Sequence, residues 1–192
     1  MLILASRSAI RRKILEDAGL EFEVLPADID EDDAKSSQDT LETIAKGLAE
    51  AKALAVSKSR PGDWVIGSDS LVAVNGRKFS KPRDRDEAAE HLRTFSGKNL
   101  LLTSAVALAR DGEIDWSHFG RAILDVRELS EEFIQSYLDA EWPAVGDTVG
   151  VFRMEGRGVQ LFRALSGGHY TILGMPLIPL LERLRHNGLL QS

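Results

Sequence analysis

The sequence predicts an α/β protein with a mixed sheet, and three observations support this fold class. Short apolar runs, such as residues 2–5 and 64–66, have the length and composition of buried strands. Stretches with helical spacing of apolar residues alternate with them, most clearly over residues 40–57. Asn75-Gly76 separates two further strand-like runs and favours a hairpin, because both turn positions need positive φ. Strand–helix units and hairpins are therefore expected in one sheet.

Most of the expected elements carry their own start or stop signal. Ser6 or Ser8 caps the helix that follows the first strand, and Gly19 ends it. Asp84 begins a helix whose acidic first turn suits the helix dipole, and Ser96 stands at its end. The other expected elements are, in chain order, a strand at 22–25, a carboxylate-rich loop at 26–39, hairpin strands at 72–74 and 77–79, long strands at 100–109 and from Asp111-Gly112 to about 126, a helix from Ser130 to about 138, strands around 149–152 and 159–162, and a closing helix at 176–186.

Length and composition fit one globular domain spanning residues 1–192. The chain is 43% hydrophobic and 28% charged, which is ordinary for such a protein. It has no cysteine, which excludes disulfides and thiolate metal sites. The net charge of −6 argues against nucleic-acid binding. No apolar run is long enough to span a membrane, and residues 2–5 are too short for a signal peptide. A cytoplasmic location is expected.

Several common catalytic motifs are missing from the sequence. The four histidines have no HExxH spacing, and neither a GxSxG elbow nor a Walker A lysine–hydroxyl pair occurs. A histidine-bound metal or a serine hydrolase is therefore not expected.

Residues 6–12, SRSAIRR, place hydroxyls and arginines where the first strand becomes a helix. Helix N-termini carry unpaired N–H groups and partial positive charge, so a phosphate fits there. An arginine adds a planar fork that matches phosphate oxygens. The alternative interpretation is a serine-capped helix with solvated arginines.

Asp69 lies in WVIGSDS, residues 64–70, where we expect the strand to end and Gly67 to let the chain turn closely. A carboxylate at a strand end can hold Mg²⁺ or Mn²⁺, or act as a base on water. The alternative is an aspartate that caps a turn.

Two lysines and an acidic loop are further candidates. Lys81 precedes a proline and could meet a phosphate as a point charge, although it could also be an ordinary surface lysine. Lys52 lies on an otherwise apolar helix face, where it either extends to water or has a partner in a cleft. Residues 28–33, DIDEDD, offer oxygen ligands for a hard cation but lack the spacing of an EF-hand.

Seven stretches carry a resemblance to a known family: LASRSAIRRKIL, DIDE, LAEAKA, GSDS, SKP, AAEHLRTFSGK and LGMPLIPLLERLR. In this order they resemble the Maf family of nucleoside triphosphate pyrophosphatases nearly from end to end. Each motif is weak alone, but their shared order makes chance agreement implausible.

The resemblance implies hydrolysis of a nucleoside triphosphate between its α and β phosphates, with a divalent cation, Mg²⁺ or Mn²⁺. It also implies a curved mixed sheet flanked by helices, with two lobes around a nucleotide-binding cleft as in inosine triphosphate pyrophosphatase-like proteins, and often a homodimer. The implied roles are catalysis and metal binding for Asp69, metal binding for Glu31, and phosphate binding for Ser6, Arg11, Lys52 and Lys81.

Three positions bear on which nucleotide base the protein would recognise. Family members that act on dTTP and UTP have arginine, threonine and glutamine where this chain has Ile10, Ser70 and Glu155. A glutamate at the third position resembles the subfamily that acts on 7-methyl-GTP. A carboxylate can accept bonds from guanine N1–H and its amino group, and its charge suits a methylated, cationic ring. A solvated turn residue is the alternative for Glu155.

The sequence departs from the subfamily elsewhere. A tryptophan is common where Ile10 stands, and a lysine where Thr148 stands. A pyrimidine triphosphate such as dTTP or UTP is therefore the second expected substrate. The alternative outside the enzymes is a non-catalytic nucleotide-binding regulator of cell division. The retained carboxylates argue against it.

Overall fold

The computed structural model describes residues 1–31 and 38–191. The chain divides into two compact units, each made of segments far apart in the sequence. Unit 1 contains Met1–Ser70, Thr103–Gly120 and Gly168–Ser192. Unit 2 contains Leu71–Leu102 and Arg121–Gly167. Part of the predicted acidic loop, residues 32–37, lies outside the described residues.

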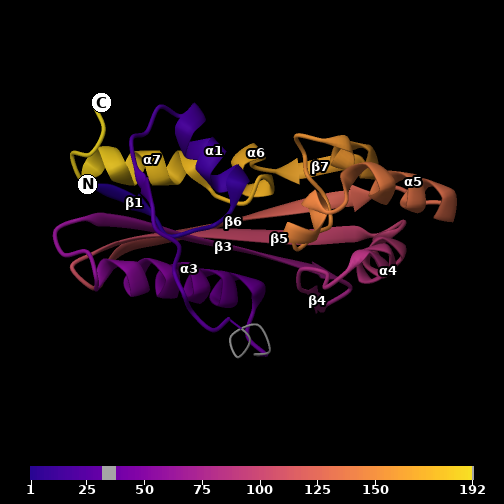
Figure 1. The fold of residues 1–192 in the computed structure, drawn as a ribbon, viewed down its shortest axis with the longest axis horizontal. Helices are drawn as coiled ribbons and strands as arrows, with labels where there is room; N and C mark the ends of the chain where they lie inside the picture. Colours follow the sequence, from indigo (N-terminus) through magenta and orange to yellow (C-terminus); the bar gives the residue numbers. More distant parts are fainter. Residues whose placement is uncertain (32–37, 192) are drawn as a thin grey trace. The chain divides into compact units, whose positions relative to one another are not determined.

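The described strands form one mixed sheet, as the sequence predicts (Figure 1). The strand order is β2-β1-β3-β5-β6-β7, and β4 pairs with β3. β1 is parallel to β2 and β3, whereas the β3–β4 and β6–β7 pairs are antiparallel. The strands are β1 (Leu2–Leu4), β2 (Glu23–Val24), β3 (Trp64–Val74), β4 (Arg77–Phe79), β5 (Asn99–Arg110), β6 (Glu113–Val126) and β7 (Phe162–Gly167).

The long helices begin at the residues that the sequence indicates. Ser8 caps the first helix, and Thr40 accepts a hydrogen bond from Thr43 N–H at 3.2 Å at the start of the next. Asp84 and Ser130 cap two helices of unit 2 in the same way. The helices are α1 (Ala9–Asp17), α3 (Leu41–Ser57), α4 (Arg85–Phe95), α5 (Glu131–Glu141), α6 (His169–Ile172) and α7 (Leu177–His186).

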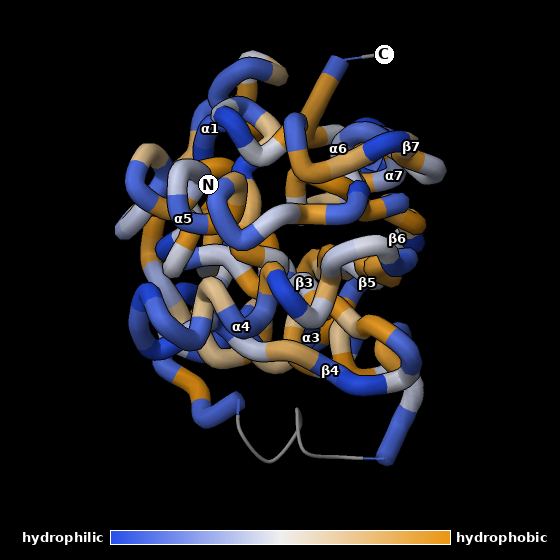
Figure 2. The backbone as a smooth tube through the Cα atoms, turned by 90° about the vertical axis from the view of Figure 1, so that its right-hand side faces the viewer, coloured by the Kyte–Doolittle hydropathy of each residue, from blue (hydrophilic) through white to orange (hydrophobic). Residues whose placement is uncertain are grey.

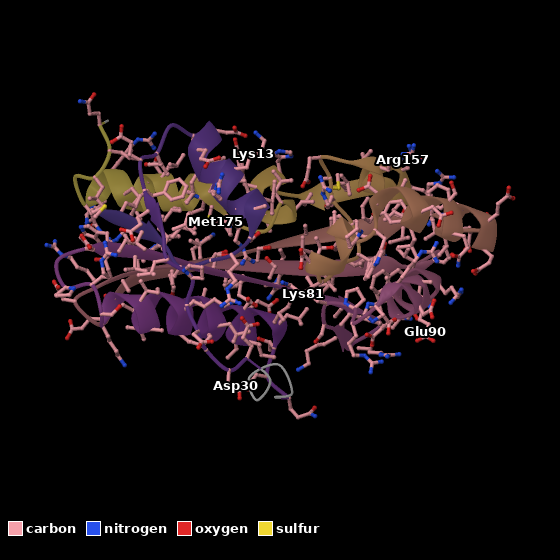
Figure 3. All side chains as sticks on the ribbon, viewed as in Figure 1. Lys13, Asp30, Lys81, Glu90, Arg157 and Met175 are labelled. Carbon is pink, nitrogen blue, oxygen red and sulfur yellow. The ribbon has the colours of Figure 1, made fainter. Side chains whose placement is uncertain are left out.

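In unit 1, α1 and α7 cover one face of the sheet and α3 covers the other (Figure 1). The core on the first face joins residues from β1, α1, β3, β5 and α7, because each contributes one apolar side. Met175, labelled in Figure 3, is fully buried in this core. Figure 2 shows how hydrophobic and hydrophilic stretches alternate along the backbone.

None of the described helices is long and apolar enough to cross a membrane.

Unit 2 packs α4 against α5 and carries two short 3₁₀ helices, η1 (Ala144–Asp147) and η2 (Arg157–Leu161). Its aromatic cluster is built on Phe79, whose ring makes edge contacts with His91 and Phe95. The hairpin at Asn75-Gly76 is confirmed, since both residues have positive φ, 51° and 79°.

Three predictions about elements are wrong. β3 does not end near Gly67 but continues to Val74, so Asp69 lies inside a strand. Residues 149–152 form no strand, and 159–162 lie mostly in η2. Val151, Phe152 and Leu161 of these two short stretches are buried by turns and a 3₁₀ helix, and hydrophobicity alone does not distinguish such residues from those of strands. The short helix α6 was not predicted.

Candidate active site

The alternation of side chains along β3 divides its SDS segment between two faces of the sheet. Asp69 is on the side of α3, where it meets Lys52. Ser68 and Ser70 are on the opposite side, where both hydroxyls donate to the Gly174 carbonyl. β3 therefore supplies a carboxylate on one face of the sheet and, on the other face, two hydroxyls that hold the Gly174 turn.

Gly67 allows α3 to come close to β3. A Cβ atom there would lie 2.1 Å from the Ala49 carbonyl oxygen and 2.7 Å from the Ala53 nitrogen. The sequence predicts a turn at Gly67, but in the structure this glycine permits the close packing of helix on strand. The approach puts Lys52 of α3 within reach of Asp69, two residues further along β3.

Lys52 forms the centre of a three-residue ionic cluster. Its Nζ lies 2.5 Å from Asp69 Oδ1 and 2.7 Å from Glu31 Oε1. The Asp69 side chain is 7% exposed, that of Lys52 12% and that of Glu31 28%. Of the two readings open for Lys52, the structure gives the second, a charged partner, because the ammonium is paired and mostly buried.

The two oxygens of the Asp69 carboxylate differ in their contacts. Its Oδ2 is buried and accepts no hydrogen bond from the described residues. A buried carboxylate oxygen without a donor is costly, so a cation or water is expected to satisfy it. No group of three or more His, Asp or Glu that could hold a metal ion occurs among the described residues. Mg²⁺, however, is commonly held by one or two carboxylates and completed by water and substrate phosphate. Asp69 and Glu31 fit that donor set.

Arg11 lies against β3 and the turn before α7. Its Nε donates to the Gly174 carbonyl at 3.0 Å, and its Nη1 to the Ser68 carbonyl at 2.9 Å. Nη2 donates to Ser70 Oγ at 2.9 Å, and Nη1 makes a long contact of 3.4 Å with Ser6 Oγ. Most of the guanidinium donors therefore hold the protein together, and few are left for a ligand.

Electrostatics tie Arg11 to the cluster around Lys52. Burial lowers the pKa of Arg11 from its usual value, and the negative charges of Asp69 and Glu31 oppose that shift. Arginine stays charged at neutral pH in any case. The two cations and two carboxylates cancel formally, so a triphosphate bound here needs added positive charge.

Sequence reasoning missed the residues that support Arg11. Gly174 has φ of 108°, a conformation suited to glycine, and its carbonyl accepts from Arg11, Ser68 and Ser70. Ser104 lies 2.9 Å from Ser70 Oγ and donates to the Thr171 carbonyl. The glycine before Met175-Pro176 was the available signal, but only folding brings it next to β3.

The other predicted site residues lie as follows. Ser6 is buried and its hydroxyl accepts from Ser8 N–H at 3.2 Å. Ile10 packs against the core of unit 1. Lys81, labelled in Figure 3, is exposed between β4 and α4 of unit 2. Glu155 lies in a turn of unit 2, with Oε1 3.3 Å from Arg153 Nε. The roles given to these four residues stay predictions.

The fold is that of a class of proteins with little sequence similarity to this chain. The Ham1 protein of Staphylococcus aureus matches with a TM-score of 0.51 at 17% identity, over 97% of this chain and 98% of that one. At this identity, the likeness shows a shared mixed α/β fold.

The sequence comparisons are more specific. Residues 1–187 match the family model described as "Maf-like protein". A protein of Rhizobium etli named 7-methyl-GTP pyrophosphatase is 44% identical over 191 residues, covering 97% of this chain and 96% of its own. A protein of Nitrobacter winogradskyi named nucleoside triphosphate pyrophosphatase is 45% identical over 191 residues, covering 98% and 95%. This chain therefore belongs to the Maf-like protein family.

Proposed function

We propose that this chain is a nucleoside triphosphate pyrophosphatase that releases a nucleoside monophosphate and pyrophosphate, with Asp69 as its catalytic carboxylate. The observation that carries the proposal is the cluster in which Lys52 bridges Asp69 and Glu31. It supplies a mostly buried carboxylate with a free oxygen and a cation beside it. Membership in the Maf-like protein family supports the assignment of pyrophosphatase chemistry to this cluster.

Each residue of the cluster has a distinct task in this proposal. Asp69 Oδ2 either takes a proton from the attacking water or holds the cation. Glu31 is the second carboxylate toward Mg²⁺ or Mn²⁺, which when bound supplies charge that stabilises the leaving pyrophosphate. Lys52 turns from the carboxylates toward a phosphate oxygen when substrate arrives. Arg11 keeps β3 and the Gly174 turn in place, in addition to its predicted phosphate contact.

For the base, 7-methyl-GTP is the proposed substrate. Glu155 would accept hydrogen bonds from guanine, and its charge would favour the methylated ring. Arg153 pairs with the same carboxylate in the structure and would have to share or release it. The relative from Rhizobium etli bears the name of this activity. Ile10 matches neither subfamily, so a pyrimidine triphosphate is kept as the second candidate.

A panel of nucleoside triphosphates tests the class and the base together. The protein is incubated with Mg²⁺ or Mn²⁺ and each nucleotide, and the released pyrophosphate and monophosphate are measured. Preference for 7-methyl-GTP supports both parts of the proposal, and preference for UTP or dTTP keeps only the class. Binding without hydrolysis across the panel would favour a regulatory protein instead.

Glu155→Gln tests the base reading by itself. Removing the charge while keeping the shape is expected to lower kcat/KM for 7-methyl-GTP by about tenfold relative to UTP, since bonds to a charged acceptor are strong. Glu128→Gln, which alters another glutamate of unit 2, is the control. Identical relative rates for Glu155→Gln and the unchanged protein would remove Glu155 from base recognition.

The resemblance also implied a homodimer, and the absence of an expected signal peptide or membrane span suggested a cytoplasmic location. Both stay predictions, and sedimentation of the purified protein tests the first of them.

A further inference from the structure

Val151 has a backbone conformation that a β-branched residue rarely adopts. Its φ is 54°, in the left-handed region, and it is fully buried. A branched residue at positive φ is strained and persists only when its surroundings hold it there. The contacts that hold Val151 are therefore informative about why the chain bends at this point.

Tyr137 of α5 holds one end of this bend. Its hydroxyl donates a hydrogen bond of 2.9 Å to the Val151 carbonyl, and the side chain is almost fully buried. Burial raises the pKa of Tyr137, so the phenol keeps the proton that it donates at any physiological pH. The bond therefore persists under the conditions in which the protein works.

Glu141, one helical turn after Tyr137, holds the other end. Its Oε1 accepts a hydrogen bond of 2.8 Å from Arg157 N–H. Residues four apart on a helix project from the same face, so α5 grips the segment 151–157 at two points. A Cβ on Gly156 would lie 2.9 Å from both Glu141 carboxylate oxygens, so glycine there permits the close approach.

The segment between these two contacts is folded by a backbone hydrogen bond of its own and is held at its start by the Thr148 hydroxyl. Gly156 N–H donates to the Arg153 carbonyl at 3.2 Å, which closes a turn. Thr148 Oγ1 accepts from Phe152 N–H at 3.1 Å and donates to the Val145 carbonyl at 2.9 Å. The turn leaves the Arg153 and Glu155 side chains 36% and 37% exposed, so they are accessible to a ligand.

We propose that Tyr137 and Glu141 are positioning residues that fix the Arg153–Glu155 turn for recognition of the nucleotide base. This inference rests on the base-reading role given to Glu155 under the proposed function. α5 acts as a rigid support, and the two hydrogen bonds transmit its position to the turn. Loss of either bond lets the strained segment relax and spreads the Glu155 carboxylate over several positions.

The test measures binding, so it does not depend on turnover. In an Asp69→Asn background, the ratio of Kd for UTP to Kd for 7-methyl-GTP is measured by calorimetry. Tyr137→Phe removes the hydroxyl and keeps the ring, and the ratio is expected to fall by about tenfold, the size of one buried hydrogen bond. Ser136→Ala, which removes an exposed hydroxyl from the same helix, is expected to leave the ratio unchanged.

A conservative pair separates positioning from simple stability. Glu141→Gln keeps an acceptor for Arg157 N–H and should preserve the ratio, whereas Glu141→Leu should lower it. Adding Tyr137→Phe to Glu155→Gln should cause no further loss, because the tyrosine acts through the glutamate. Thermal unfolding of every variant confirms that each is folded when binding is measured.

The outcomes are distinct. An unchanged ratio in Tyr137→Phe, while Glu155→Gln lowers it, overturns the positioning role and leaves the base assignment intact. An unchanged ratio in Glu155→Gln overturns both. Failure of the unchanged protein to hydrolyse any nucleotide would count against the proposed activity, but the binding ratios would still decide the positioning role.

Discussion

Asp69 and Lys52 are 17 residues apart in the chain, and their contact defines the chemistry of the candidate site. The ammonium lies between two carboxylates, in a place that a small cation would also favour. Lysine and a divalent metal therefore compete for the same pair of carboxylates, unless a phosphate draws the ammonium away.

Lys52→Met tests this competition. The variant is expected to bind Mn²⁺ about tenfold more tightly than the unchanged protein without nucleotide, because the competing charge is gone. Electron paramagnetic resonance of free Mn²⁺ measures the affinity. Lys46→Met, which removes the same charge elsewhere on α3, should have little effect. Equal or weaker Mn²⁺ binding in Lys52→Met would show that the ammonium does not occupy the cation position.

Asp69→Asn tests the carboxylate itself. It removes the base or metal ligand while keeping the size of the side chain, so hydrolysis is expected to fall by about 10³-fold. Nucleotide binding should remain measurable by calorimetry, since the cations are intact. Asp17→Asn, at an exposed ion pair on α1, is the control. Turnover that survives in Asp69→Asn would contradict the mechanism.

At the scale of elements, the packing of α3 on β3 places Lys52. Gly67→Ala would drive a methyl group into the Ala49 carbonyl, which belongs to the backbone and cannot rotate away. We expect a loss of about 3 kcal/mol in the free energy of unfolding and reduced hydrolysis, because α3 must move from β3. Urea unfolding and steady-state rates measure the two effects.

Gly47→Ala is the matched control on α3. A Cβ there meets no atom within 4 Å, and alanine favours helix over glycine. We expect it to stabilise the protein by about 0.5–1 kcal/mol and to leave hydrolysis unchanged. A similar loss of stability in both variants would mean that the close packing at Gly67 is not the cause.

At the scale of the whole molecule, acid stability depends in part on Asp115 of β6. Its carboxylate accepts from Arg183 at 2.8 and 2.7 Å and from Asn187 at 2.9 Å, which ties β6 to α7 and the residue after it. The Arg183 hydrogen bonds hold the pKa of Asp115 below its usual value. Because the folded pKa is depressed, the pair contributes stability above about pH 3.9 and loses it as pH falls through the folded pKa.

Asp115→Asn should therefore be less stable than the unchanged protein at pH 7, by about 1–2 kcal/mol. The difference should shrink as the pH falls from 4 toward 2, because both proteins then lack the charge. Urea unfolding at several pH values measures it. A constant difference over this range would contradict the proposed linkage.

Local patterns determined much of this protein. Capping at Ser8, Thr40, Asp84 and Ser130, and the Asn75-Gly76 hairpin, were predictable because a few neighbouring residues decide them. The order of the weak motifs predicted the family in a similar way, since each motif is a short stretch of neighbouring residues. The candidate roles of Asp69 and Lys52 followed from that resemblance.

Only the tertiary structure decided how those residues meet. β3 continues through Asp69 because the polar side chains of this part of the strand have partners on both faces of the sheet. The partners come from α1, α3 and the Gly174 turn. The left-handed Val151 and its grip by Tyr137 are also tertiary, since no local preference favours that conformation. Sequence determines what a short segment prefers, whereas contacts between distant segments determine which buried polar groups are satisfied, and the site is made of such contacts.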